Sequence, residues 1–410
     1  MSKKPTIYWK IKKLDEQGAT INIAYGERAN GKSYQVKHEK GIYNFMHETD
    51  SYFDSYKDKG HILHQLIPSG KKFVLLRRWK EEISTEKIEQ YFDDVDVVSI
   101  TDGKYNCITM YKKRLFLSNY NNENGKTTRG PLIGYVCALS TEQNYAGGSY
   151  LDVTDIIYEE WMTRTTFIAN EPDRFMNFYS TIDRKRGTTR VWMVGNSISR
   201  VSPYISDWDL HSIFSTLKQG QIATKWIPTG DVDDDGVPIE VKIAIEYCES
   251  TGRSSFVIGK HSKMLNKGDW QSDPQPHLPK SIKYYKIMMT IGFQYLDFKF
   301  KANYMIDAET KETCWFIYPF KGEFKPNMIV FSDVVKVSRY WQRDIYNPSI
   351  NNDRIKMILN TFKENKIFYA TDLCGTDFKQ CIDFEIRKWN GGNNHGTYKF
   401  RNFIKRNKTW

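Results

Sequence analysis

The fold of this chain is decided by the stretch INIAYGERANGKSYQV, residues 21–36. Its central part, Gly26–Ser33, fits the pattern G-x-x-x-x-G-K-[ST] of a phosphate-binding loop. The two glycines let the backbone wrap and point its N–H groups at phosphate oxygens. Lys32 supplies a charge for the β- and γ-phosphates, and the Ser33 hydroxyl suits Mg²⁺. We therefore expect ATP and Mg²⁺ as cofactors. The residues expected to contact the nucleotide are Gly26, Glu27, Arg28, Ala29, Asn30, Gly31, Lys32 and Ser33.

The amino-acid composition limits the classes of protein to which this chain can belong. The 410 residues are 40% hydrophobic and 15% aromatic, enough to form two globular domains. The net charge of +11 favours nucleic acid as partner over a membrane, although a generic basic surface is the alternative. No stretch approaches the roughly 18 apolar residues of a membrane span, and the basic N-terminus has no apolar signal core. The six cysteines are scattered. We therefore expect a cytoplasmic protein that is not secreted and binds neither a membrane nor zinc.

The pattern of apolar runs divides the chain. Residues 1–222 alternate short apolar runs with helix-like stretches, which predicts an α/β domain with a parallel central sheet. Asn106–Asn119 resembles an inserted hairpin. We expect residues 223–240 to be a linker, although the turn-rich part Thr229–Pro238 equally suits a hairpin tip. The aromatic strand-like runs of residues 241–410 predict a smaller, mixed α+β domain.

Two more strands of the first domain are predicted to end in polar residues. The run Val153–Tyr158 is followed by Glu159 and Glu160. Adjacent carboxylates at the end of an apolar strand are costly unless a cation lies there. Glu159 is therefore expected to hold the Mg²⁺ shell and Glu160 to orient or deprotonate the attacking water, the alternative being a solvated acidic turn. Asn196 follows a third strand, where it either senses the γ-phosphate or merely suits the turn.

Five segments together resemble a known family: GERANGKS, FVLLRRWKEE, GYVCALST, IIYEEW and RVWMVGNSIS. They are similar to the additional-strand catalytic-glutamate (ASCE) ATPases. More closely, residues 15–205 resemble the DNA encapsidation ATPases of small, short-tailed, protein-primed bacteriophages. The resemblance implies a homopentameric ring at the portal of a preformed capsid in the host cytoplasm, threading in double-stranded DNA, in some cases with a scaffold RNA. It assigns catalytic or binding roles to Lys32, Ser33, Glu159, Glu160 and Asn196.

The resemblance also implies an arginine that completes the site of a neighbouring subunit. In such motors this arginine comes shortly before the strand that ends in the Asn, which here is the stretch Asp183–Arg190. We expect Arg186 to have this role, with Arg184 next. One alternative is that this stretch is only a basic, solvated helix end. The other is that the catalytic arginine is Arg28, acting within its own subunit.

For the C-terminal domain the resemblance implies a ribonuclease-H-like nuclease that has lost catalysis and contacts DNA or the portal. The expected strand Tyr284–Gly292 carries no acid, and Asp297, Asp307 and Asp333 fit no two-metal spacing, so we expect no cleavage. The basic, aromatic tail Arg387–Trp410 suits either nucleic-acid contact or packing.

Two functions from different classes follow. The first is an ATP-driven motor that packages DNA. The alternative is a P-loop NTPase switch or assembly factor that binds nucleic acid without translocation. A dedicated catalytic glutamate at Glu160 favours the motor.

Overall fold

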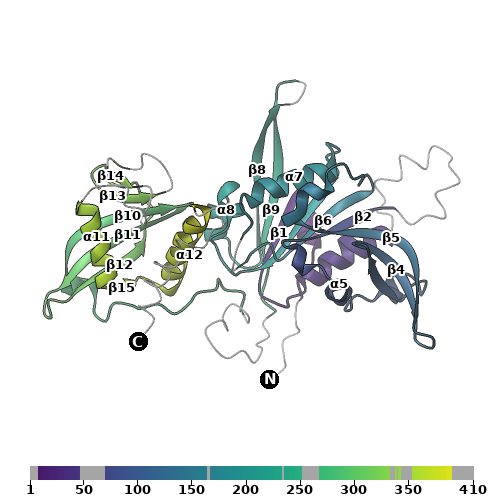
Figure 1. Cartoon of the computed structure of the whole chain (residues 1–410), viewed down its shortest axis with the longest axis horizontal. Helices are drawn as coiled ribbons and strands as arrows, with labels where there is room; N and C mark the ends of the chain where they lie inside the picture. The colour runs from purple at the N-terminus through teal and green to yellow at the C-terminus, as the bar shows by residue number, and fades with distance from the viewer. Residues whose placement is uncertain are drawn as a thin grey trace. The chain divides into compact units, whose positions relative to one another are not determined.

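The structure is a computed structural model. It describes residues 8–46, 70–163, 167–232, 235–251, 267–332, 338, 340–342 and 353–389. The chain forms two compact units, which Figure 1 shows by element and colour. The first comprises Met1–Ile198, Ser212–Val257 and Ser262–Asp269, and the second Ser199–His211, Ile258–His261 and Trp270–Trp410.

A nine-stranded sheet forms the first unit, in the order β3-β4-β5-β2-β6-β7-β1-β9-β8. The strands are β1 (Ile21–Gly26), β2 (Lys72–Arg77), β3 (Cys107–Tyr111), β4 (Arg114–Asn121), β5 (Lys126–Ala138), β6 (Val153–Glu159), β7 (Arg190–Asn196), β8 (Gln221–Val232) and β9 (Pro238–Tyr247). The six central strands from β5 to β9 pair in parallel, and the outer pairs are antiparallel. All six residues of β1 are buried, as expected for a strand covered on both faces. The predicted α/β class is thus confirmed.

Helices precede β1 or lie between these strands in the sequence. They are α1 (Lys12–Asp15), α2 (Lys32–Val36), η1 (Lys37–Tyr43), α3 (Asn44–Met46), η3 (Lys80–Glu82), α5 (Thr85–Tyr91), α6 (Val97–Ile100), η4 (Leu139–Tyr145), α7 (Glu171–Asp183), α8 (Pro203–Asp207), which belongs to the second unit, and α9 (His211–Thr216). Local sequence explains their ends. Ser84 caps α5 by accepting a hydrogen bond from the Lys87 amide at 3.3 Å. Pro172 lies in the first turn of α7, where its missing N–H costs nothing. The predicted hairpin is confirmed as β3 and β4, which turn at Lys112 and Lys113.

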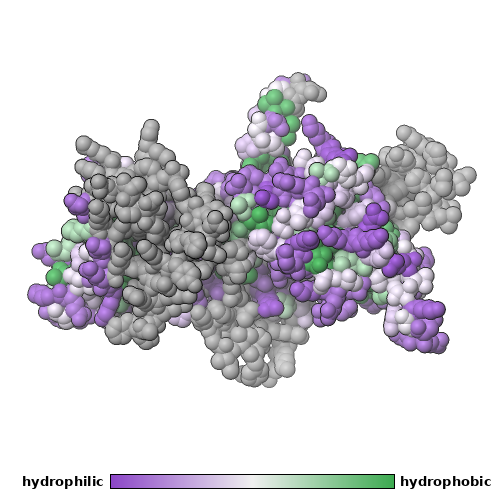
Figure 2. All heavy atoms as spheres, viewed as in Figure 1, coloured by the Kyte–Doolittle hydropathy of each residue, from purple (hydrophilic) through white to green (hydrophobic). Residues whose placement is uncertain are grey.

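The domain boundary differs from the prediction. Residues 223–240 are not a linker, because they lie almost entirely in the antiparallel hairpin of β8 and β9. Strand β9 pairs in parallel with β1, with Ile21 opposite Ile243, so this hairpin extends the first sheet. The alternative of a hairpin tip at Thr229–Pro238 was therefore the better one. Figure 2 shows hydrophobic residues on the protruding hairpin, where Trp226, Val232 and Val237 are exposed.

The second unit contains a six-stranded mixed sheet in the order β14-β13-β10-β11-β12-β15. Its elements are η5 (Ile282–Tyr284), β10 (Tyr285–Tyr295), β11 (Phe298–Asp307), β12 (Thr313–Pro319), β13 (Ile329–Ser332), β14 (Tyr340–Gln342), α11 (Asp353–Glu364), β15 (Lys366–Tyr369) and α12 (Asp372–Trp389). Aromatic residues fill its core; for example, the Trp315 ring stacks on Phe362 with centroids 3.9 Å apart.

Nothing in the described part of this second unit resembles a two-metal nuclease centre. Among the described residues of the chain, no group of three His, Cys, Asp or Glu side chains could hold a metal ion. The Asp307 carboxylate instead accepts hydrogen bonds from the amides of Glu309 and Thr310, as a turn residue does. Asp333 and residues 390–410 of the basic tail lie outside the described residues. Across the described ranges, no helix is long and apolar enough to cross a bilayer.

Candidate nucleotide site

The phosphate loop joins the end of β1 to the start of α2. Gly31 caps α2 in the left-handed conformation, with φ +94°, and Gly26 has φ +147°. A Cβ at Gly26 would also lie 3.1 Å from the Cys248 carbonyl oxygen. Both positions therefore need glycine, as the motif predicts.

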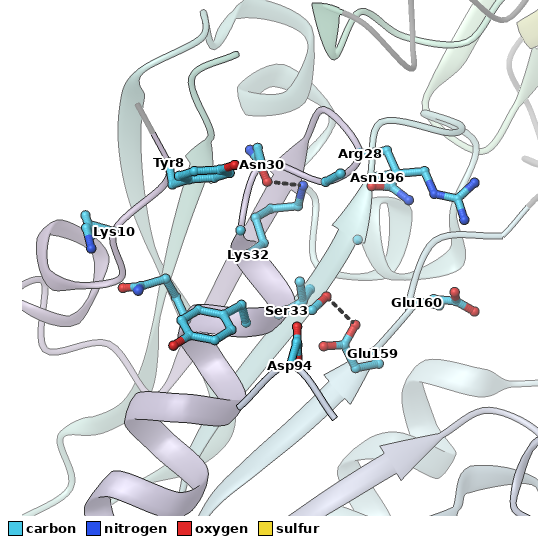
Figure 3. A pocket seen from close by; sticks show the side chains of 16 residues that line it. Tyr8, Lys10, Arg28, Asn30, Lys32, Ser33, Asp94, Glu159, Glu160 and Asn196 are labelled. Atoms are coloured by element: carbon cyan, nitrogen blue, oxygen red, sulfur yellow. Dashed lines mark hydrogen bonds between the residues drawn. The ribbon is translucent and has the colours of Figure 1, made fainter. Parts of the chain in front are cut away.

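A cavity of about 630 Å³ opens beside this loop. Its lining brings together loop residues Arg28–Ser33 with Glu159, Glu160 and Asn196, which come from the ends of β6 and β7 (Figure 3). Gly26 and Glu27 do not line the cavity. Glu27 is buried, and its carboxylate accepts hydrogen bonds from the amide and hydroxyl of Thr251 at 2.8 and 3.0 Å.

Lys32 lies inside the loop. Its Nζ donates to the Glu27 carbonyl oxygen at 2.5 Å and to Asn30 Oδ1 at 2.8 Å (Figure 3 marks the second). Burial lowers the pKa of Lys32, although acidic groups around it, including Glu159, oppose this shift. An ammonium held by neutral oxygens in a buried place is ready to exchange one of them for a phosphate oxygen.

Glu159 is the buried member of the acidic pair, with 5% of its surface exposed. Its Oε2 accepts a hydrogen bond from the Ser33 hydroxyl at 3.1 Å (Figure 3), and its Oε1 accepts one from the Tyr91 hydroxyl at 2.7 Å. Burial raises the pKa of the Glu159 carboxyl, whereas the Tyr91 hydrogen bond and the charge of Arg77 lower it. Tyr91, at the end of α5, was missed by the sequence analysis, because nothing local marks its partner.

Glu160, in contrast to Glu159, carries an exposed side chain. Its backbone is left-handed, with φ +56°, and its side chain is 67% exposed. The carboxylate forms an ion pair with Arg77, with Nη2 and Oε2 3.2 Å apart. The turn itself is fixed by Arg78, which is buried, bonds Glu171 through Nε at 3.0 Å and donates from Nη1 to the Glu160 carbonyl at 3.0 Å. The two carboxylates thus occupy distinct environments.

Ser197, the residue after Asn196, links the end of β7 to the loop. Its amide donates to the Gly26 carbonyl at 3.1 Å, and its hydroxyl donates to the Gly268 carbonyl. The Tyr247 hydroxyl donates to the same Gly268 oxygen at 2.8 Å. A Cβ at Gly268 would lie 2.7 Å from the Glu27 amide nitrogen, so glycine lets this segment pack directly on the phosphate loop.

The geometry of Arg186 does not suit the predicted catalytic role. Its Nε, Nη1 and Nη2 all donate within the chain. The acceptors are the carbonyl oxygens of Tyr150, Leu151, Val153, Ile182 and Asp183 and the hydroxyl of Thr189. The guanidinium thus caps the C-terminus of α7 and ties it to the start of β6. Arg184 and Arg28 are both exposed, and of the two it is Arg28 that lines the cavity.

Residues 34–215 match the sequence model of the family described as podovirus DNA encapsidation protein (Gp16). The DNA packaging protein of Bacillus phage phi29 is 26% identical over 208 residues, 50% of this chain and 51% of that protein. That of Bacillus phage B103 is 30% identical over 166 residues, 40% of this chain and 46% of that protein. These matches span about half the length of the curated relatives.

Two solved structures are also similar. One is the bacteriophage phi29 viral genome packaging motor assembly, with TM-score 0.46 and 17% identity, covering 93% of this chain and 99% of that chain. The other is the N-terminal domain of the DNA packaging ATPase from bacteriophage phi29, with TM-score 0.37 and 22% identity, covering 58% and 95%. Over residues 34–215, this chain is therefore similar to the podovirus DNA encapsidation protein family.

Proposed function

We propose that this chain is an ATPase motor that translocates double-stranded viral DNA into a preformed capsid. The observation that carries the proposal is the cavity at which the phosphate loop, Glu159, Glu160 and Asn196 converge. Strand β7 lies between β1 and β6, the arrangement that the name of the additional-strand ATPases describes. The relatives named above are DNA packaging proteins, which supports DNA as the cargo.

The chemistry of the site suits ATP with Mg²⁺. The Ser33 hydroxyl and the Glu159 carboxylate lie 3.1 Å apart, and oxygen ligands of this kind are those that Mg²⁺ prefers. The ion neutralises charge on the β- and γ-phosphates when it is bound. Lys32 binds the same phosphates, Glu160 orients or deprotonates the attacking water, and Asn196 contacts the γ-phosphate or that water. Glu160 leaves its ion pair with Arg77 to do so.

A neighbouring subunit completes the site through Arg184 and not Arg186. All three guanidinium nitrogens of Arg186 already donate within the chain, whereas Arg184 and Lys185 are exposed on the same loop. Arg184 donates from Nη2 to the Gly148 carbonyl oxygen. The Asp183 carboxylate fixes this loop by accepting from the amides of Gly187 and Thr189, at 2.9 and 3.0 Å. Arg184 ends α7 in the left-handed conformation that is common at helix C-termini, with φ +50°, and Lys185 follows it with φ +62°.

Mixing variants tests this assignment. Rings that contain both Lys32→Ala and Arg184→Ala subunits should regain ATP turnover, because a Lys32→Ala subunit still donates Arg184 to an intact neighbouring loop. Mixtures made with Lys185→Ala in place of Arg184→Ala are the matched control. Absence of rescue, together with loss of turnover in Arg28→Ala alone, would assign the finger to Arg28 within its own subunit.

Two of the crossings of the chain between the units start beside the nucleotide site and carry the effect of hydrolysis toward the second unit. The chain passes from Asn196 through Ser197 into the second unit at Ser199, and again from Asp269 into that unit at Trp270. Ser197 bonds Gly26 and Gly268, so one hydroxyl and its amide join the phosphate loop to both connections. We infer that a shift of Asn196 on γ-phosphate release reaches the second unit by this route, where a vestigial nuclease-like fold contacts DNA and the portal.

A nucleotide switch without translocation is the second candidate. The observation that favours it is the exposed Glu160 side chain, ion-paired with Arg77 rather than directed at Ser33. The deciding experiment measures ATP turnover with and without portal-bearing empty capsids and duplex DNA, together with protection of that DNA from nuclease. A homopentameric motor, with or without a scaffold RNA, predicts stimulation by both components and protected DNA. Turnover indifferent to capsids, without protection, would favour the switch.

A further inference from the structure

A second cavity of the first unit, of about 270 Å³, lies at the turn between β3 and β4. Three consecutive cations line it: Lys112, Lys113 and Arg114. The rest of the lining comes from the end of β5, the last residue of η4 and the segment after it, and it contains no carboxylate. The proposed nucleotide site does not use any of these residues.

The turn between β3 and β4 has lysines at positions where smaller residues are usual. Lys112 and Lys113 both have positive φ, +48° and +60°. Tight hairpin turns with two such residues are normally made with Asn, Asp or Gly, because a larger side chain is strained there. The turn is anchored to β5 by a hydrogen bond from the Val136 amide to the Lys113 carbonyl at 2.9 Å. Two strained lysines held at a cavity point to use of their charge.

The charge of the three cations is not balanced nearby. Among the described residues, the ion pairs of this unit do not include Lys112, Lys113 or Arg114. Asp152 is close enough to raise the pKa of Tyr135, but it is ion-paired with Lys72 and does not line the cavity. The site therefore favours an anion.

Tyrosines form the opposite wall. Tyr135 and Tyr150 meet edge to face, with ring centroids 5.3 Å apart, and Tyr145 is held by accepting from the Ala138 amide at 2.9 Å. Burial raises the pKa of Tyr150 to about 12, so its phenol stays neutral. Gly148 keeps this wall open, because a Cβ there would lie 2.7 Å from the Tyr150 ring.

The chemistry excludes a nucleophilic site. Burial raises the pKa of the Cys137 thiol to about 12, so the thiolate that attack requires is not formed at neutral pH. Cations beside aromatic rings are instead the combination that binds single-stranded nucleic acid, the cations taking phosphates and the rings stacking on bases.

We propose that this cavity binds one nucleotide of a single-stranded nucleic acid, its phosphate on Lys112, Lys113 and Arg114 and its base on Tyr135 or Tyr150. The strand is either RNA or an unpaired stretch of DNA, which share this chemistry. The site does not need ATP hydrolysis, so it stands or falls independently of the motor.

The test is fluorescence anisotropy of the full chain with labelled oligouridylate, oligothymidylate and a blunt DNA duplex over a range of salt. Lys113→Gln with Arg114→Gln should weaken binding of single strands about tenfold and flatten the log–log salt slope by roughly 0.7 for each lost phosphate contact. The matched control, Lys104→Gln with Lys126→Gln, also removes two exposed cations of this unit and should change affinity less than twofold.

Aromatic variants separate stacking from charge. Tyr150→Ala should weaken single-strand binding about tenfold and Tyr150→Phe should not, with thermal melting showing that both variants fold. Measurement in a Lys32→Ala background keeps the result separate from nucleotide binding. Tighter binding of oligouridylate assigns the site to RNA, and tighter binding of oligothymidylate to unpaired DNA. Equal losses in test and control pairs, or tighter binding of the duplex with no effect of Tyr150→Ala, would overturn the proposal.

Discussion

Replacement of Arg186 by alanine distinguishes a structural arginine from a catalytic one. The guanidinium joins the last turn of α7 to the segment that enters β6 by hydrogen bonds to six acceptor atoms. Five of the acceptors are main-chain carbonyls, two of which belong to α7 and would lose their cap. A cation at a helix C-terminus also interacts favourably with the helix dipole.

The expected loss in the free energy of unfolding depends on those hydrogen bonds of Arg186 that water cannot replace after the substitution. A hydrogen bond to a charged group contributes about 1.5–3 kcal/mol, and several of these acceptors share one nitrogen. We therefore expect Arg186→Ala to lose about 3 kcal/mol, which lowers the melting temperature of a unit of this size by roughly 6–12 °C. Arg184→Ala, which removes an exposed side chain, should cost less than about 1 kcal/mol.

Differential scanning fluorimetry and urea unfolding measure both variants, and ATP turnover is then compared at a temperature where both are folded. The structural role predicts a large loss of stability for Arg186→Ala with turnover retained in the folded fraction. If Arg186→Ala melts with the unchanged chain and yet loses turnover, the reasoning from its hydrogen bonds is refuted and Arg186 is the arginine that acts between subunits.

Five further outcomes are expected. Lys32→Ala should abolish ATP binding, whereas Glu160→Gln should bind ATP and Mg²⁺ but turn over roughly 10²-fold more slowly, as equilibrium binding and phosphate release assays will show. DNA binding should be independent of sequence and fall with salt at a log–log slope near −0.9 for each phosphate contact, as titrations of unrelated duplexes can check. The chain should not cut DNA with Mg²⁺ or Mn²⁺, and cleavage that disappears in Asp307→Asn would contradict this. Burial raises the pKa of Asp377 from 3.8 to about 6 despite its ion pair with Arg200. The stability gained from its protonation is full below about pH 4 and is lost as the pH rises through about 6. Urea unfolding of Asp377→Asn should therefore lack this dependence, worth up to about 3 kcal/mol.

Much of the site was predictable because its signals are local. A phosphate loop is a continuous stretch, so the glycines, Lys32 and Ser33 could be assigned from spacing alone. Sequence alone could not decide the role of Arg186, because an arginine three residues beyond a helix equally suits a C-terminal cap, and its hydrogen bonds to the carbonyls of Tyr150 and Leu151 favour the cap. Tyr91 gave no signal, since its contact with Glu159 spans 68 residues.

The prediction of the domain boundary was wrong for a similar reason. Strand β9 carries the alternating residues of a sheet, but nothing in its sequence states that it pairs with β1, about 220 positions earlier. The turn-rich stretch before it predicts a boundary between domains, whereas the strands on either side of that stretch pair in the same sheet. Pairing between distant strands is decided by packing and not by local propensity.

The order of the strands in the sheet explains why the polar residues at the ends of β1, β6 and β7 meet. This order cannot be read from the order of the segments along the chain. Strand β7 follows β6 in sequence but lies between β6 and β1 in the sheet. Because these strands are parallel, their carboxyl ends lie at one edge, with Gly26 opposite Asn196 and Glu159 opposite Val194. Asn196 must then lie between the phosphate loop and the acidic pair, where a γ-phosphate and its attacking water would be. The left-handed turn at Glu160 ends β6 at that edge, so the buried Glu159 stays at Ser33 while the next carboxylate is left in solvent.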